Sequence, residues 1–318
     1  MPLVRLLTGD ESRPGAGRQE EALTLSQRFP GLVVAARDVA ASVLQGVHGR
    51  RRAGSGETFW QFRPFVAGES RGRIDWRRSA RDDRLYVRER EWEAAHTVML
   101  WIDRSASMRF VSKLALQAKI DRALVLGLAA ADLLVQGGER VGLLGLTRPL
   151  AARNIVERFG EVLLNEFRIR EKNGKASEAE ELPAAEVLPR NSQAVLIGDF
   201  LSAPQDIAAT IETLGALGAR GHLVMIADPV EETFPFAGNT EFIDVDSSAR
   251  LRVGQAESFR ADYIRRLNAH REAIRAAARA RGWTLMLHRT DRPATEALLG
   301  LRMQLEANLL NAAAGRAL

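Results

Sequence analysis

Cysteine is absent from the sequence, and long apolar runs are scarce. Without cysteine the protein has no disulfide bonds, thiolate metal sites or cysteine nucleophiles, which agrees with a reducing compartment. Residues 1–30 contain no continuous apolar stretch of signal-peptide length. The longest apolar run, at 123–135, covers about two-thirds of the roughly twenty residues that a membrane span needs, and Asp132 interrupts it. We therefore expect a cytoplasmic protein without a membrane span.

Motifs for nucleotide hydrolysis and zinc catalysis are missing as well. No GxxxxGK[ST] segment occurs, and no GxGxxG follows an expected strand. None of the five histidines stands in an HExxH or other ligand spacing. Ser105 lies outside any GxSxG context and has no histidine near it in the sequence. These absences predict a protein that is not an enzyme.

An excess of charge of one sign is also missing. The chain has 45 Lys and Arg against 40 Asp and Glu, a net charge of only +5, which is a weak argument for nucleic-acid binding. Its 318 residues, of which 46% are hydrophobic, suffice for a large buried core. One α/β domain with an appendage is therefore expected.

Apolar runs alternate with segments of helical periodicity from residue 96 onward. Five runs lack polar alternation, as parallel strands covered on both faces do, and they lie at 97–103, 140–146, 193–200, 222–228 and 283–289. Helices are expected at 113–136, 155–167, 205–219, 256–281 and 293–310. This order predicts a doubly wound, mostly parallel, Rossmann-like α/β sheet.

The remaining segments are predicted to be additions to this sheet. A helix is expected at 32–49, and two strands flanking a short helix are expected within 57–91. The predicted organisation is an N-terminal segment at 1–95 with a helix and a β-hairpin appendage, a main domain at 96–290 with a hairpin insertion near 231–255, and a C-terminal helix at 291–318.

The strongest short motif is Asp103-Arg-Ser105-Ala-Ser107, which follows directly on the run VMLWI. Ligands of doubly wound sheets bind outside the carboxyl ends of the strands, so these side chains are expected at the functional edge. One carboxylate and two hydroxyls are hard oxygen ligands that suit Mg²⁺ or Mn²⁺. The alternative is that Asp103 caps the following turn while the serines bond to the backbone.

Asp199 ends the run AVLIGDF in the same manner. If the two strands are neighbours, Asp199 faces Asp103 across the crevice and could hold the metal through water. The alternative is a carboxylate that only begins the loop LSAP. Asp228 in MIADP ends a further run, but the proline after it favours a role in a turn.

These features resemble the von Willebrand factor A domain, in which a DxSxS segment after the first central strand and a strand-terminal aspartate form a metal-ion-dependent adhesion site. Three further segments narrow the resemblance, namely 63–93, 227–246 and 288–301. They are similar to the bacterial family known as domain of unknown function 58. The similarity covers most of the chain from about Phe59 onward.

The resemblance implies a parallel sheet flanked by helices and a divalent cation. It also implies a protein-interaction adaptor that works with a MoxR-type AAA+ ATPase in protein assembly or maturation. The open coordination position of the ion would accept a carboxylate from an acidic protein ligand. A complete adhesion site adds a threonine from a later loop, but 148–161 contains none and Thr147 is the nearest candidate. The expected ligands are Asp103, Ser105, Ser107 and Asp199, in a site that is incomplete without the threonine.

Arginines recur between residues 71 and 90 among acidic and aromatic residues. Guanidinium groups favour bidentate contacts with carboxylates and phosphates, which makes Arg71, Arg73 and Arg77 candidates for partner binding. The favoured alternative is an internal ion-pair lattice, since acids stand three or four positions away. Ile74 and Trp76 would then anchor the segment by burial.

Three classes of function stay open at this point. The leading hypothesis is the binding adaptor. The second is a metal-dependent phosphoester hydrolase that uses Asp103 and Asp199, for which no general base can be named. The third is nucleic-acid binding through the arginine segment, which the balanced charge disfavours.

Overall fold

The structure is a computed structural model, and it describes residues 7–8, 17–47, 59–66, 70–81, 84–90, 96–172, 181–189, 192–243 and 250–314. The chain divides into two compact units. The larger unit consists of 1–48 and 96–318, and the smaller unit consists of 49–95.

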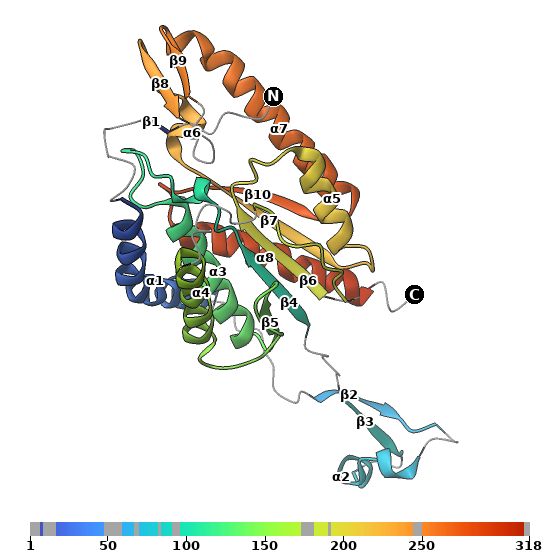
Figure 1. The fold of residues 1–318 in the computed structure, drawn as a ribbon. Helices are drawn as coiled ribbons and strands as arrows, with labels where there is room; N and C mark the ends of the chain where they lie inside the picture. Colours follow the sequence, from blue (N-terminus) through green and yellow to red (C-terminus); the bar gives the residue numbers. More distant parts are fainter. Residues whose placement is uncertain are drawn as a thin grey trace. The chain divides into compact units, whose positions relative to one another are not determined.

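A five-stranded parallel sheet forms the centre of the larger unit (Figure 1). Its strand order is β10-β7-β6-β4-β5, and every neighbouring pair is parallel. The strands are β4 (Thr97–Ile102), β5 (Arg140–Leu143), β6 (Ser192–Gly198), β7 (Arg220–Ala227) and β10 (Thr284–Arg289). The five apolar runs are these five strands, so the predicted doubly wound α/β class is confirmed.

Helices cover both faces of this sheet (Figure 1). One face carries α1 (Gly17–Val47), α3 (Lys119–Gln136), α4 (Ile155–Lys172) and α8 (Ala294–Ala314), and the other carries α5 (Pro204–Leu214) and α7 (Arg260–Ala280). Successive residues of β4 alternate between the faces: Leu100 and Ile102 join the core under α3, whereas Met99 and Trp101 join the core under α5 and α7. Burial on both faces explains the unbroken apolar runs.

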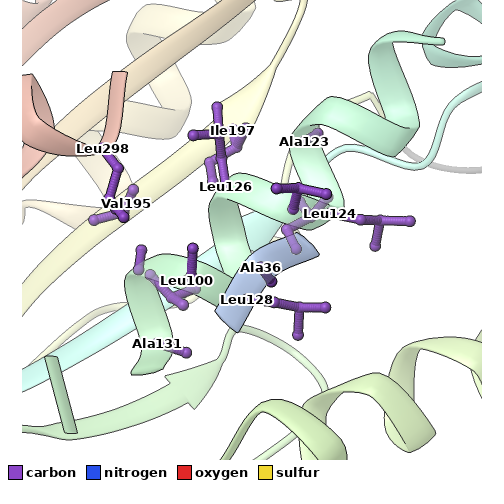
Figure 2. Packing of buried hydrophobic residues seen from close by; sticks show 14 of the residues in the cluster. Ala36, Leu100, Ala123, Leu124, Leu126, Leu128, Ala131, Val195, Ile197 and Leu298 are labelled. Carbon is purple, nitrogen blue, oxygen red and sulfur yellow. The ribbon is translucent and has the colours of Figure 1, made fainter. Parts of the chain in front are cut away.

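The helix α3 lies at the centre of its layer. Fifteen of its eighteen residues are buried. Figure 2 shows its Leu124 and Leu128 beside Ala36 of α1, within the same apolar cluster. A helix buried on nearly every side needs cover all round, which α1, α4, α8 and the sheet provide. Among the described helices, none combines the length and apolar content that crossing a membrane requires.

The observed division of the chain differs from the predicted boundaries. The predicted segment 1–95 joins α1 to the residues of the separate smaller unit. α1 instead packs on the larger unit, because Phe29, Ala36 and Ala40 are buried in its core. α8 also contributes core residues, so the predicted C-terminal segment 291–318 is a layer of the same unit.

The hairpin predicted near 231–255 is present between β7 and α7. It consists of β8 (Thr240–Ile243) and β9 (Arg250–Val253), which pair in antiparallel fashion, while 244–249 lie outside the described residues. The short strand β1 (Leu7–Thr8) pairs with β8. A short helix, α6 (Pro229–Thr233), connects β7 to this hairpin, and Phe234 and Phe242 belong to a separate apolar cluster there.

The smaller unit contains the arginine-rich segment. The strands β2 (Phe59–Pro64) and β3 (Tyr86–Arg90) pair in antiparallel fashion around a 3₁₀ turn, η1 (Arg71–Arg73), and a short helix, α2 (Trp76–Ser79). Ile74 is buried, as predicted. Trp76 is 61% exposed, so its predicted anchoring role is wrong. It is the first residue of α2, and the residue that this helix buries is Ser79.

The three candidate arginines have different places in this unit. Arg71 and Arg77 are exposed, whereas the side chain of Arg73 lies outside the described residues. The neighbouring Arg78 places its guanidinium over the ring of Tyr86, 5.1 Å from the centroid. Partner binding by these arginines stays a prediction.

Acid sensitivity is expected from the buried His222 on β7. Its ring nitrogens lie 2.8 Å from Thr284 Oγ1 and 3.1 Å from Gln193 Oε1, and burial lowers its pKa from 6.5 to about 4. Between these two pKa values the unfolded chain binds a proton at His222 that the native state does not bind. The free energy of unfolding therefore falls as the pH drops below 6.5. At about 1.4 kcal/mol per pKa unit, the loss between pH 6.5 and 5 is about 2 kcal/mol.

Urea denaturation at these two pH values, on wild type and His222→Gln, measures this effect. The pH-dependent loss should be about 2 kcal/mol smaller in the variant, because the titrating group is gone. Equal losses in both proteins would assign the acid sensitivity to other groups.

Candidate functional site

Asp103 and Asp199 follow two neighbouring strands at the centre of the sheet. From β4 the chain first passes to β5 on one side, and later it returns to β6 on the other side. Such a reversal is a topological switch point, where doubly wound proteins bind ligands in the crevice outside the strand ends. Asp103 follows β4 and Asp199 follows β6. These two strands are neighbours in the sheet, as the predicted proximity of the two aspartates requires.

The carboxylate of Asp103 is only half satisfied by hydrogen bonds. Its amide extends the sheet by donating to Ile197 O at 2.8 Å, and its Oδ1 accepts from the Ser105 amide at 2.8 Å. Its Oδ2 is buried without a hydrogen-bond partner. Gly198 makes room for this side chain, because an added Cβ there would lie 2.8 Å from Asp103 Cβ and 3.0 Å from Oδ2.

The two serines of the DxSxS segment lie together. Their Oγ atoms are 3.0 Å apart, and both side chains are buried. Ser105 precedes a 3₁₀ turn, η2 (Ala106–Arg109), without capping it through its hydroxyl. The alternative interpretation, a turn capped by Asp103, agrees with the structure in one respect, because Asp103 accepts from the Ser105 amide. It differs in the other, because the hydroxyl groups of the serines pair with each other and not with the backbone.

Lys119 is a residue of the candidate site that sequence analysis missed. It is the first residue of α3 and is 1% exposed. Its Nζ donates to Asp199 Oδ2 at 3.0 Å and to Glu231 Oε1 at 2.6 Å. The available signal was a lysine at the head of an apolar helix, because an ammonium group is almost never fully buried unless it is paired.

The predicted helix at 113–136 begins later, at Lys119, because the residues before it form a loop. The Ser112 amide donates to Asp228 Oδ2 at 2.9 Å, and the Lys119 amide donates to Phe110 O at 3.2 Å. Asp228 also accepts from Val230 N at 2.9 Å and forms a capping box with Glu231. The turn role predicted for Asp228 is confirmed, and the same box holds Glu231 beside Lys119.

The site contains more carboxyl groups than ammonium groups. Burial, followed by the charge of Asp199, raises the pKa of Asp103 to about 8. Burial also raises the pKa of Glu231. Burial alone would lower the pKa of Lys119, but the charges of Asp199 and Glu231 outweigh it and raise that pKa. One ammonium group against the buried carboxyl groups of Asp103 and Asp199 and the 20% exposed carboxyl group of Glu231 leaves a site that attracts protons or a further cation.

The residues fit a divalent cation that takes few ligands from the protein. Across the described ranges, no three acidic or imidazole side chains are grouped as a metal site. Asp103 Oδ2 and the hydroxyls of Ser105 and Ser107 are the hard oxygens that would hold Mg²⁺ or Mn²⁺, with water at the other positions. Thr147 has a different role, since its Oγ1 accepts from Leu143 N at 2.8 Å and closes the turn after β5.

Fold and site together define a doubly wound α/β protein with a DxSxS segment at its switch point, the arrangement expected of a von Willebrand factor A-like protein. The chain belongs to the DUF58 family, described as a protein of unknown function, whose profile matches residues 61–273. Uncharacterized proteins of Mycobacterium bovis and Mycobacterium tuberculosis are 26% identical over 299 residues, which are 90% of this chain and 89% of theirs.

Solved structures to which the chain is similar include an aerotolerance-related membrane protein from Bacteroides fragilis, at 11% identity and a TM-score of 0.37, covering 67% of this chain and 100% of that chain. The conserved hypothetical protein BatB from Bacteroides thetaiotaomicron matches at 10% identity and a TM-score of 0.34, covering 67% and 98%. The Rpn10 VWA domain matches at 9% identity and a TM-score of 0.31, covering 65% and 94%. These likenesses concern the fold alone.

Proposed function

We propose that this chain is a non-enzymatic protein-interaction adaptor whose site at the carboxyl edge of the sheet binds a partner's carboxylate through Mg²⁺ or Mn²⁺. The buried, unpartnered Oδ2 of Asp103 carries the proposal. A divalent cation would satisfy this oxygen together with the hydroxyls of Ser105 and Ser107. Such ions keep several water ligands, and a carboxylate from another protein can replace one of them.

The loop beside the site supports an interaction role. Val111, Leu114 and Leu116 are 51%, 54% and 93% exposed, and Lys113 stands exposed among them. The Ser112 amide fixes the loop to Asp228, so these side chains are presented by a held backbone. Apolar side chains around a lysine suit an acidic partner segment that also carries apolar residues.

The class of partner is proposed from the resemblance to the DUF58 family, whose members are commonly proposed to work as adaptors with MoxR-type AAA+ ATPases. In this proposal, the adaptor acts in the cytoplasm, in the assembly or maturation of other proteins. An acidic segment of the ATPase or of its protein substrate would supply the carboxylate that binds at the metal.

Calorimetric titration of Mn²⁺ and Mg²⁺ into the full chain tests the metal site. Wild type should bind saturably, and Asp103→Ala should lose at least tenfold in affinity, because it removes the carboxylate from the proposed ligand set of Asp103, Ser105 and Ser107. Asp206→Ala removes an exposed aspartate from α5 and serves as the matched control, with unchanged binding expected. Absence of saturable binding in wild type would reject the proposal.

A further inference from the structure

We propose that the Lys119 ammonium group is a resident cation of this site, which holds Asp199 away from a bound metal ion. A divalent ion then gains Asp199 only when Lys119 is removed or displaced. The inference rests on the proposed metal binding at Asp103 and adds a determinant of its affinity.

Lys119 is buried and paired with two carboxylates. Its Nζ lies 3.0 Å from Asp199 Oδ2 and 2.6 Å from Glu231 Oε1, and its side chain is 1% exposed. Asp199 is 4% exposed. Separating two charged groups this deeply buried is costly, because bulk water cannot solvate either of them. Asp199 therefore remains paired with the Lys119 ammonium group.

The pair of Lys119 and Asp199 lies beside Asp103. Asp199 follows β6, and Asp103 follows β4, which is paired with β6. The Asp103 amide donates to Ile197 O, and an added Cβ at Gly198 would lie 2.8 Å from Asp103 Cβ, so the Asp103 side chain lies beside the residue that precedes Asp199. The charge of Asp199 accordingly raises the pKa of Asp103. A metal ion at Asp103 would therefore meet both the attraction of Asp199 and the repulsion of Lys119.

Lys119 also lowers the net negative charge of the site. The ammonium group neutralises one unit of negative charge between Asp199 and Glu231, which leaves less attraction for a divalent ion. Removing Lys119 restores a second carboxylate to the site and removes a positive charge beside it. Both changes act in the same direction, toward tighter binding of a cation.

The test is a Mn²⁺ titration of full-length variants that are shown to be folded by circular dichroism. We expect Lys119→Met to bind Mn²⁺ at least tenfold more tightly than wild type. The double variant Lys119→Met with Glu231→Gln guards against unfolding, because it also removes one of the two carboxylates that Lys119 neutralises, and it should still bind Mn²⁺ more tightly than wild type. Adding Asp199→Asn to either variant should abolish the gain, and Lys172→Met, which removes an exposed lysine at the end of α4, should bind as wild type does.

The outcomes separate this inference from the proposed function. If wild type binds through Asp103 but the folded Lys119 variants bind no more tightly, the inference alone is overturned. If only the Lys119 variants bind, and they need Asp199, the inference holds while metal-dependent capture by the natural protein is rejected. If no variant binds Mn²⁺, both proposals are rejected.

Discussion

Replacing Lys119 by methionine is expected to lower the free energy of unfolding by about 3–5 kcal/mol in a metal-free buffer. Methionine has a similar length and preserves packing at the head of α3, but it removes the cation that Asp199 and Glu231 share. The buried Asp199 and the partly exposed Glu231 would then lose the cation that neutralises them, or they would have to take up protons. Urea denaturation followed by tryptophan fluorescence measures the change.

Two further variants give this measurement its controls. Lys113→Met removes an exposed lysine and should change the free energy of unfolding by no more than about 0.5 kcal/mol. Lys119→Met combined with Glu231→Gln should lose less stability than Lys119→Met, because one carboxylate loses its cation instead of two. If Lys119→Met were no more destabilising than Lys113→Met, the pair would have no net stabilising role.

An alanine at position 221 is expected to destabilise the protein by about 3 kcal/mol, since it forces extra volume into a filled core. Gly221 lies on β7 against the ring of Trp283, and an added Cβ would be 2.3 Å from Cε3 and 2.4 Å from Cζ3. Trp283 is 2% exposed, and its Nε1 donates to Ala219 O at 3.2 Å. A rigid, buried ring cannot move aside cheaply, so the strand must shift.

Gly31→Ala is the matched control for this substitution. Gly31 is exposed on α1, and an added Cβ meets no atom within 4 Å. Alanine favours a helix over glycine by up to about 1 kcal/mol, so this variant should equal or exceed wild type in thermal stability. A Gly221→Ala protein as stable as wild type would mean that the Trp283 ring has room to move.

The candidate site was predictable where its residues are local in the chain. Asp103, Ser105 and Ser107 occupy one short segment, and an aspartate directly after an apolar run is visible in the sequence. Lys119 could not be placed there, because its partners are 80 and 112 positions away. Gly198 also escaped notice, since its role depends on the side chain that lies against it from the neighbouring strand.

The sheet itself follows from local pattern. Each central strand is covered on both faces, which requires an unbroken apolar run, and each run is bounded by segments with helical spacing. The predicted class of fold and the five strands therefore needed no knowledge of distant contacts. Trp76 shows the limit of such reasoning, because its 61% exposure depends on where a short helix turns.

Strand order and charge pairing were set by distant parts of the chain. The position of β4 between β5 and β6 creates the switch point, and no periodicity within a strand specifies its neighbours. Folding then brings the head of α3, the end of β6 and the cap of α6 to one buried spot, where Lys119 meets Asp199 and Glu231. Charges that are harmless when separated in water become strongly coupled once burial removes the solvent that screened them.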